Sequence, residues 1–279
     1  MSIDIPATSN PSGVPCWVEL ATTDEAVTRD FYGRLFGWTY HLDRDPSTPN
    51  GRYLTASLET FDASGLYHAW AGWPTGWTVR ISVPSIVNAA ARIEHLGGKL
   101  MLGPVDVPRR GSVVHAIDPS GAPVVLWQPP PDWDFVSGLP NTFSSADLNT
   151  RDGAATDHFF GRLFNYKAVR IGNGRSIDYV AWRLNQQPLL YRYVMGPEYH
   201  PDTAPHWVVY FEIDHARGTD ATAGHALLLG GKVLIEPYDS PWGRIAHLAD
   251  PTGAIFSIVD RSVTAENWSR AEVDDPYDD

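Results

Sequence analysis

Cysteine and long apolar runs are scarce in this chain of 279 residues. The single cysteine, Cys16, excludes an internal disulfide and fits a reducing compartment. No run approaches the roughly 18 apolar residues that a membrane span needs. The N-terminus also lacks a basic region followed by an apolar one. We therefore expect a cytoplasmic protein that does not act at a membrane.

Positive charge is also scarce. The formal net charge is −12, and the three lysines, Lys99, Lys167 and Lys232, do not cluster. Binding to nucleic acid needs grouped Lys and Arg side chains that displace counterions from phosphates, so we expect no nucleic-acid partner. Tryptophan, by contrast, is abundant. Eleven indoles suit either bulky cores or the walls of a site for flat apolar ligands.

One phrase occurs twice in the sequence and divides the chain. Residues 31–38 read Phe-Tyr-Gly-Arg-Leu-Phe-Gly-Trp, and residues 159–166, which lie 128 positions later (159 − 31), read Phe-Phe-Gly-Arg-Leu-Phe-Asn-Tyr. The turn Asp118-Pro-Ser-Gly121 returns as Asp250-Pro-Thr-Gly253, 132 positions later (250 − 118). Similarity at a nearly constant offset indicates an internal duplication.

Each half divides again into two similar quarters. In the first quarter, residues 17–21 alternate as in a strand, and a helix begins near Asp24, where Thr22 and Glu25 have the spacing of a capping box. The predicted buried face of this helix carries Val27, Phe31 and Leu35. About three strand-like segments follow, and the same order recurs in every quarter. We expect an α+β fold of four βαβββ modules in two domains.

A proline-rich stretch near the middle of the chain predicts the boundary between the domains. Residues 129–140 are the expected linker. It separates a first domain of residues 14–128 from a second domain of residues 141–260. Residues 261–279 form an acidic tail, and we expect its end, residues 274–279, to be disordered.

Together, the βαβββ quarters, the repeated helix end and the Asp-Pro-x-Gly-Ala turn before each last strand resemble the vicinal oxygen chelate superfamily. That superfamily includes glyoxalase I, bleomycin-resistance proteins and extradiol dioxygenases. Within it, the chain is similar to two-domain actinobacterial proteins labelled hydroxylase or glyoxalase-like. The resemblance covers about residues 14–260 and implies paired modules that curve into a cleft. Because one fold hosts many chemistries, the resemblance alone does not assign an activity.

The resemblance also implies positions for a metal. The superfamily holds a divalent metal through His, Gln or Glu side chains at fixed strand positions. Here these positions carry none of His, Asp, Glu or Cys: they are Trp17, Thr78 and Val125 in the first domain and Ser145, Val208 and Ser257 in the second. A shift of one residue turns a side chain to the opposite face of a strand, so an adjacent carboxylate does not replace them. We expect no metal and no other cofactor.

Side chains two positions apart on a strand share a face, which extends the predicted walls of the two clefts. The candidate catalytic residues are Tyr210 and two acids at the same place in the two copies, Glu19 and Asp147. A carboxylate in a partly apolar cleft has a raised pKa and can act as a general acid or base. The alternative, which the sequence favours, is a buried Glu19–Arg80 ion pair, with Asp147 similarly hydrogen-bonded.

The candidate ligand-binding residues lie on the same strands or near the loops between modules. On the strands they are Trp17, Thr78, Arg80, Ser145 and Glu212. Near the loops they are Trp70, Trp73, Trp77 and His206. Packing between the domains explains the three loop tryptophans equally well. His115 and His247, which match across the two copies, are expected to be buried structural residues.

These observations predict a metal-independent protein that binds a bulky aromatic or polyketide-like small molecule. We favour an enzyme of secondary metabolism that performs a tailoring hydroxylation, isomerisation or cyclisation by acid–base chemistry. Sequestration of a drug would need the same kind of site. Another alternative is a metal-dependent lyase or oxygenase with a displaced ligand set, such as His115 or His247 with Glu19 or Asp147. A third is an interaction module whose Trp-rich loops bind a protein.

The sequence leaves the identity of the ligand and the choice between monomer and homodimer open. The second copy of the repeated phrase has diverged, ending in Asn165-Tyr166 where the first ends in Gly37-Trp38. This divergence favours one working cleft and one structural cleft.

Overall fold

The computed structural model describes residues 11–171 and 177–263. Most of the predicted acidic tail therefore lies outside the described residues. The described part consists of four consecutive units, each with a strand, a helix and three further strands. The predicted α+β architecture of tandem βαβββ modules is confirmed.

The first half of the chain contains two of these units. They are β1 (Pro15–Thr22), α1 (Glu25–Phe36), β2 (Thr39–Arg44), β3 (Arg52–Leu58) and β4 (Phe61–His68), followed by β5 (Gly76–Ser82), α2 (Ile86–His95), β6 (Lys99–Val107), β7 (Gly111–Ile117) and β8 (Pro123–Gln128).

The second half repeats the order. Its units are β9 (Phe143–Thr150), α3 (Gly153–Phe164), β10 (Lys167–Arg170), β11 (Tyr179–Leu184) and β12 (Gln187–Val194), followed by β13 (His206–Glu212), α4 (Thr219–Leu228), β14 (Lys232–Ser240), β15 (Gly243–Ala249) and β16 (Ile255–Asp260).

Each half forms one eight-stranded sheet, and the two sheets have the same topology. The strand order is β2-β3-β4-β1-β5-β8-β7-β6 in the first sheet and β10-β11-β12-β9-β13-β16-β15-β14 in the second. The two modules of a sheet meet at an antiparallel pair, β1 with β5 or β9 with β13. These central strands carry most of the residues that the sequence nominates.

Helix α1 begins where the sequence predicts, but its cap and its buried face differ. The N-cap is Asp24, whose carboxylate accepts hydrogen bonds from the backbone N–H groups of residues 26 and 27, so the predicted Thr22–Glu25 capping box is wrong. Val27 is 41% exposed, and Thr28 is buried in its place. The buried stripe follows residues 28, 31, 32 and 35, because the helix packs through its Phe31–Tyr32 side.

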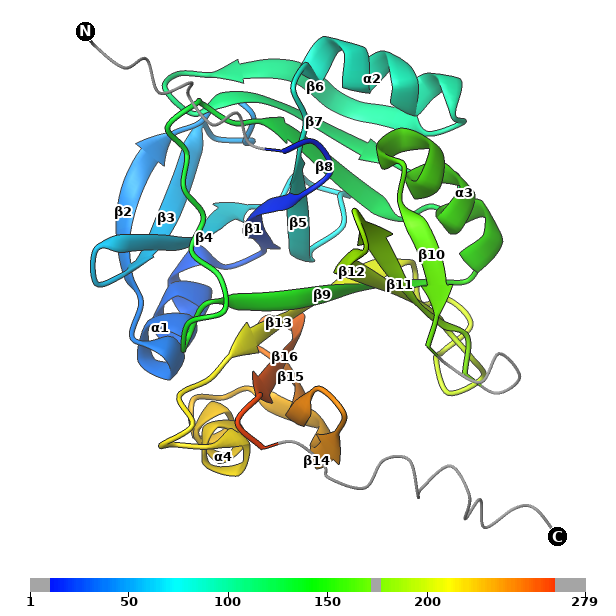
Figure 1. Cartoon of the computed structure of the whole chain (residues 1–279). Helices are drawn as coiled ribbons and strands as arrows, with labels where there is room; N and C mark the ends of the chain where they lie inside the picture. The colour runs from blue at the N-terminus through cyan, green and yellow to red at the C-terminus, as the bar shows by residue number, and fades with distance from the viewer. Residues whose placement is uncertain (1–10, 172–176, 264–279) are drawn as a thin grey trace, which may run out of the picture.

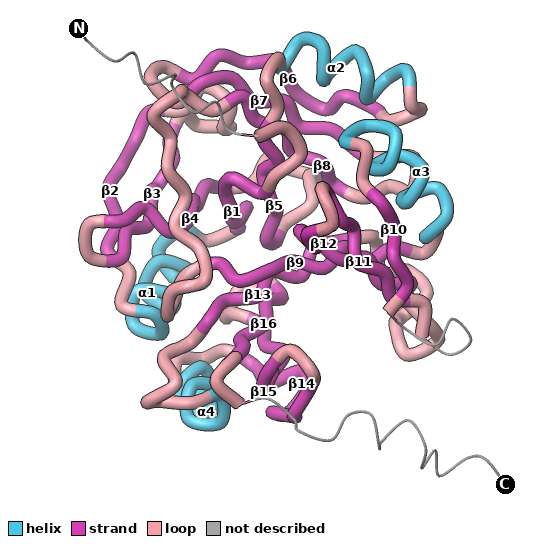
Figure 2. The backbone as a smooth tube through the Cα atoms, in the orientation of Figure 1, coloured by secondary structure: helices cyan, strands magenta, loops and turns pink. Residues whose placement is uncertain are grey.

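The two halves share one hydrophobic core. Helix α1 lies beside α4, and α2 lies beside α3, so each helix of the first half contacts a helix of the second (Figure 1). The ring of Phe211 on β13 packs against three rings of the first half, Phe36, Trp38 and Trp77, at centroid distances of 5.1, 5.5 and 4.9 Å. The four helices lie at the periphery of the strands in the view of Figure 2.

The two faces of each curled sheet have different partners. In β1, Val18 and Leu20 belong to the core that includes the helices, whereas Trp17 belongs to a separate cluster on the other face. We call the face turned away from the helices the inner face. No helix in the described ranges is long and apolar enough to cross a membrane.

Candidate functional site

The inner face of the first sheet carries a buried ion pair. Strand pairing places Glu19 opposite Thr78 and Trp17 opposite Arg80. The Arg80 guanidinium contacts Glu19 Oε2 through Nε at 2.9 Å and Nη2 at 2.5 Å, and Tyr53 donates its hydroxyl to the same oxygen at 3.0 Å. Burial alone would raise the pKa of Glu19, but the Arg80 charge and these hydrogen bonds hold it below its usual value. The expected Glu19–Arg80 pair is present.

Aromatic side chains enclose this pair. The indole of Trp133, from the segment between the sheets, packs edge-on against Trp17 and Trp127 at 5.1 and 4.6 Å, and donates a hydrogen bond to the Cys16 carbonyl at 3.0 Å. The side chains of Arg80 and Glu19 are 1% and 0% exposed. The centre of the first inner face is therefore filled by side chains of the sheet and by Trp133 from the segment that follows β8.

The inner face of the second sheet has one carboxylate without an ion pair. Asp147 accepts hydrogen bonds from the hydroxyls of Tyr210 on β13, at 2.9 Å, and Tyr179 on β11, at 3.1 Å. No Lys, Arg or His in the described part of the chain forms a salt bridge with it. Because burial outweighs the two tyrosine hydrogen bonds, the pKa of Asp147 is raised to about 7.

More tyrosines surround Asp147 and are only partly buried. The ring of Tyr191 stacks on that of Tyr179 at 5.7 Å, and Tyr193 and Tyr199 continue the series with centroids 6.1 Å apart. Tyr238, on β14, is 40% exposed. Aromatic rings that are partly open to solvent around a buried acid suit a flat ligand with a polar group directed at the acid.

The two inner faces are equivalent in position but differ in chemistry. Glu19 pairs across the sheet with Gly65, whereas Asp147 pairs with Tyr191. On the other side, Arg80 lies beside Val125, whereas Tyr210 lies beside Ser257. The duplication thus has an arginine-neutralised acid in one sheet and a tyrosine-bound acid in the other.

The loop tryptophans do not act as one group. Trp70 and Trp73 pack on each other at 4.5 Å, and both rings contact His115, at 6.0 and 6.2 Å, near the first inner face. Trp77 lies on the helix side of the sheet, where its indole donates a hydrogen bond to the Tyr32 hydroxyl at 2.9 Å. Its neighbours on β5, by contrast, face inward, because successive residues of a strand point to opposite faces.

The remaining nominated residues are in the second half. Ser145 lies opposite Tyr210, within the inner face. Glu212 accepts a hydrogen bond from Ser144 at 3.1 Å and forms a 3.4 Å ion pair with Arg261 at the end of the sheet. His206 lies 3.4 Å from the Asn149 amide and contacts the Tyr199 ring at 6.3 Å, at the edge of the tyrosine group.

Curated relatives match nearly the whole chain. The anthracycline biosynthesis protein DauV of Streptomyces sp. (strain C5) is 31% identical over 264 residues, which cover 89% of this chain and 93% of that protein. The protein named "Putative glyoxylase CFP32" of Mycobacterium bovis is 33% identical over 263 residues, with 88% and 94% covered. A scan against models of protein families finds no match.

Solved structures show the same fold at low sequence identity. A Mn(II)-bound glyoxalase from Novosphingobium aromaticivorans aligns with a TM-score of 0.63 at 15% identity, covering 90% of this chain and 83% of that one. The 2,3-dioxygenase LapB of Pseudomonas sp. KL28 also gives 0.63, at 14% identity, with 89% and 93% covered. The chain belongs to the vicinal oxygen chelate superfamily.

The donor set of this superfamily member does not fit the metal that its relatives' fold implies. The strand register brings the predicted metal positions of each sheet together on the inner face, with Val125 beside Arg80 and Ser257 beside Tyr210. Their side chains are indole, aliphatic or hydroxyl groups, which are poor ligands for a divalent cation without carboxylate or imidazole partners. Among the described residues, no group of three or more His, Cys, Asp or Glu side chains could hold a metal.

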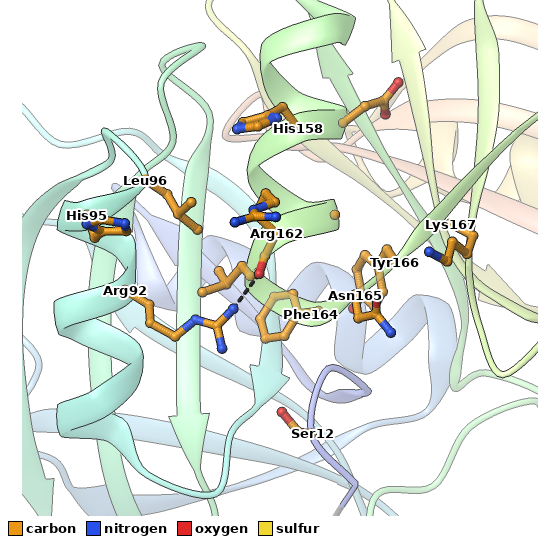
Figure 3. Close-up of a pocket in the computed structure, with 13 residues that line it drawn as sticks. Ser12, Arg92, His95, Leu96, His158, Arg162, Phe164, Asn165, Tyr166 and Lys167 are labelled. Atoms are coloured by element: carbon orange, nitrogen blue, oxygen red, sulfur yellow. Dashed lines mark hydrogen bonds between the residues drawn. The ribbon is translucent and has the colours of Figure 1, made fainter.

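Two surface pockets of this member of the superfamily lie away from both acids. One, of about 910 Å³, lies between α2 and α3 (Figure 3). Within it, Arg92 donates a hydrogen bond to the Arg162 carbonyl. The other, of about 610 Å³, lies beside the β2–β3 loop. Neither is lined by Glu19 or Asp147.

Sequence reasoning missed most of the tyrosine group. The residues that it did not nominate are Tyr179, Tyr191, Tyr193, Tyr199 and Tyr238. The sequence does contain a pattern that indicates part of this group: Tyr191 and Tyr193 are two positions apart on β12, so their side chains share a face. That face could be assigned to Asp147 only after the parallel pairing of β12 with β9 was known.

Proposed function

We propose that this protein binds a bulky aromatic, polyketide-like small molecule at the tyrosine-lined inner face of the second sheet, and that Asp147 transfers a proton there without a metal. The observation that carries the proposal is the state of Asp147. It is buried, it has two tyrosine donors and no ion pair in the described residues, and its pKa is about 7. A group with a pKa near the working pH is the most effective general acid or base.

The chemistry that suits this arrangement is an isomerisation or a cyclisation. The Asp147 carboxylate would accept a proton from an acidic C–H or phenolic O–H group of the ligand. The resulting carboxylic acid would return the proton at another atom of the same ligand, so that neither an oxidant nor a reductant is needed. The Tyr210 and Tyr179 hydroxyls keep the carboxylate oriented, and the neighbouring rings stack on the ligand.

The name of DauV, an anthracycline biosynthesis protein, supports a fused-ring ligand and a role in secondary metabolism for this chain. The first sheet supports the choice of the second as the working site. There, Arg80 neutralises the equivalent acid, and Trp133 packs on Trp17 and Trp127 of the same inner face. We assign the first inner face a structural role.

Binding and proton transfer are tested with 1,8-dihydroxyanthrone, which has an acidic C–H between its rings, and with 1,8-dihydroxyanthraquinone, which lacks it. Both are expected to quench tyrosine and tryptophan fluorescence. In D₂O, the wild-type protein is expected to accelerate deuterium uptake at the anthrone carbon, followed by mass spectrometry. Asp147→Asn should still bind both compounds but lose most of the acceleration, about 10²-fold or more.

The matched control is Asp132→Asn, which removes a carboxylate from an exposed position of the linker and should exchange like wild type. Binding without faster exchange in the wild-type protein would leave sequestration as the function. An absence of binding to both compounds would contradict the proposed ligand class.

The proposal that proton transfer needs no metal is tested separately. Protein purified without chelator is expected to contain no stoichiometric Fe, Zn, Ni or Mn by elemental analysis, and its exchange activity should survive added chelator. A stoichiometric metal, or an activity lost to chelator and restored by one of these ions, would favour the alternative with a displaced ligand set.

A further inference from the structure

A series of side chains leads from Asp147 to the surface, and most of its members have no role in the proposed function. Beyond Tyr210, the series continues through Ser257 on β16 and His247 on β15 to Tyr238 on β14. We propose that Tyr210, Ser257, His247 and Tyr238 form a proton relay that exchanges protons between Asp147 and solvent. This inference rests on the proposed role of Asp147 as the acid–base group.

The members of the series lie on neighbouring strands, and three of their contacts are hydrogen bonds of 3.0 Å or less. The Tyr210 hydroxyl lies 2.9 Å from Asp147 Oδ2, and it also shares a hydrogen bond with Ser257 on the adjacent strand. Ser257 Oγ lies 2.7 Å from His247 Nδ1, and His247 Nε2 lies 3.0 Å from the Tyr238 hydroxyl. Ser257 is 0% exposed, whereas Tyr238 is 40% exposed. The series therefore leads from the interior to the surface.

One assignment of the hydrogens satisfies every contact. Because Tyr210 gives its single hydroxyl proton to Asp147, Ser257 must be the donor to Tyr210. Its oxygen can then accept from His247, which requires the tautomer with the proton on Nδ1. The free Nε2 lone pair then accepts the hydroxyl proton of Tyr238. All four donors thus point toward Asp147.

This orientation allows a proton to enter without forming a stable buried ion. Solvent gives a proton to Tyr238, and the hydroxyl proton of Tyr238 moves to His247 Nε2. The proton on His247 Nδ1 moves to Ser257. The Ser257 proton then moves to Tyr210, and the Tyr210 proton moves to Asp147. Asp147 gains one proton, solvent loses one, and His247 changes tautomer. Burial lowers the pKa of His247 to about 4, so it remains neutral between such transfers.

Of the four residues in this series, only the histidine has a counterpart in the first sheet, namely His115. His115 pairs across the strands with Val125, which has no hydroxyl, and Arg80 replaces the tyrosine that contacts the acid. Nε2 of His115 is buried and has no hydrogen-bond partner among the described residues. The hydroxyl series is present only beside the acid that titrates near neutral pH.

The groups that face Asp147 from its surroundings are all tyrosines, and burial raises the pKa of each of them. They are Tyr179, Tyr191, Tyr199, Tyr210 and Tyr238. His247 contacts Tyr210, Tyr238 and Ser257. His206 contacts Tyr199 at the edge of this group, and burial lowers its pKa below the usual value. A transition near pH 7 in this group of residues is therefore assigned to Asp147.

The relay is tested by NMR on the full chain labelled with ¹⁵N-histidine and ¹³C-aspartate, without any ligand. His247 should be the Nδ1–H tautomer, and its ¹⁵N shifts should change with a midpoint near that of the Asp147 carboxyl carbon. The change should vanish in Ser257→Ala and in Asp147→Asn. His115 is the internal control and should show no change near neutral pH.

The exchange rate separates a relay from a static hydrogen-bond network. In wild type, the Asp147 carboxyl carbon should give one averaged resonance through its titration. Ser257→Ala and Tyr238→Phe should slow proton exchange about tenfold or more and broaden that resonance. Ser257→Thr keeps the hydroxyl and should restore fast exchange.

If Ser257→Ala does not fold, Ser257→Val serves instead, because valine occupies the equivalent position in the first sheet. An Nε2–H tautomer of His247 while Asp147 is ionised, or exchange that stays fast in both hydroxyl-deleted variants, would overturn the relay. Neither readout depends on a bound anthrone, so its failure is distinguishable from failure of the proposed function.

Discussion

At the scale of single residues, one difference between the two copies separates an acid that is paired with arginine from an acid that has no ion pair in the described residues. Arg80 lies where the second sheet has Tyr210. A guanidinium stabilises the ionised form of a neighbouring carboxylate, whereas a phenol hydroxyl only partly offsets burial. Glu19 therefore has a lowered pKa, and Asp147 has one raised to about 7.

The raised pKa of Asp147 makes a prediction about stability. In the folded protein the Asp147 carboxyl holds its proton up to about pH 7, whereas the ordinary pKa of an aspartate is 3.8. In this interval the folded state binds more protons than the unfolded state, so ionisation of Asp147 lowers stability as pH rises. Relative to wild type, Asp147→Asn should gain up to about 4 kcal/mol in unfolding free energy between about pH 4 and pH 8.

This prediction is checked by urea unfolding of both proteins at several pH values. The quantity to compare is the difference between the two free energies, because other titrating groups cancel from it. A difference that stays constant with pH would show that the pKa of Asp147 is not raised.

The buried Glu19–Arg80 pair leads to a second prediction about stability, which concerns the loss of its cation. Arg80→Met leaves the Glu19 carboxylate buried without its cation, and should lower the free energy of unfolding by about 3–5 kcal/mol at neutral pH. Adding Glu19→Gln should recover a large part of this loss, because the uncompensated charge is removed. Urea unfolding of wild type, both single variants and the double variant measures this coupling. Additive losses in the double variant would contradict it.

At the scale of elements, β4 passes so close to the Tyr53 side chain that residue 65 has no room for a side chain. A Cβ atom on Gly65 would lie 1.7 Å from the Tyr53 hydroxyl. The second sheet has Tyr191 at this register position and leaves Tyr179 more exposed. The small residue on β4 is thus one reason why the first inner face is closed.

Gly65→Ala should therefore destabilise the protein by about 1–3 kcal/mol, because the added methyl group displaces Tyr53 from the buried cluster. Gly224→Ala in α4 is the matched control, since a Cβ there would meet no atom within 4 Å. It should be neutral or stabilising by about 0.5–1 kcal/mol. Thermal unfolding of the two variants distinguishes them, and equal melting temperatures would contradict the prediction.

At the scale of the whole molecule, the two halves are joined through a common core as well as by the linker. The indole of Trp38 donates to the Asn141 carbonyl at 2.9 Å, and that of Trp207 donates to the Pro123 carbonyl at 2.8 Å. Together with the Phe211 ring cluster, these contacts bury aromatic surface from both halves. Neither half should therefore unfold alone.

Phe211→Ala tests this coupling. The substitution should cost about 3–5 kcal/mol, because it leaves a cavity among three rings of the other half. Calorimetry should record one unfolding transition in wild type, and the variant's transition should move to lower temperature. Two separate transitions in the wild-type protein would show that the halves unfold independently.

The duplication, the module order and the lack of His, Asp, Glu or Cys at the six expected metal positions can all be read from the amino-acid sequence alone. These features follow from local information: a repeated phrase, alternation along strands and the identities of six residues. It also placed Glu19 and Asp147 at equivalent positions and proposed the Arg80 pair. Such inferences need only periodicity and register, which neighbouring residues specify.

Only the assembled fold shows which of the two acids has an ion pair and which has tyrosine partners. The tyrosines that surround Asp147 come from β11, β12, β13, β14 and the loop before β13, and only the sheet order brings them to one face. On the other inner face, Trp133 contacts the Cys16 carbonyl and the Trp17 ring, which precede it by more than a hundred residues. Burial and the positions of distant charges set a carboxyl's pKa. Neither quantity can be read from local sequence, so Glu19 and Asp147 remained alike until the strands were assembled.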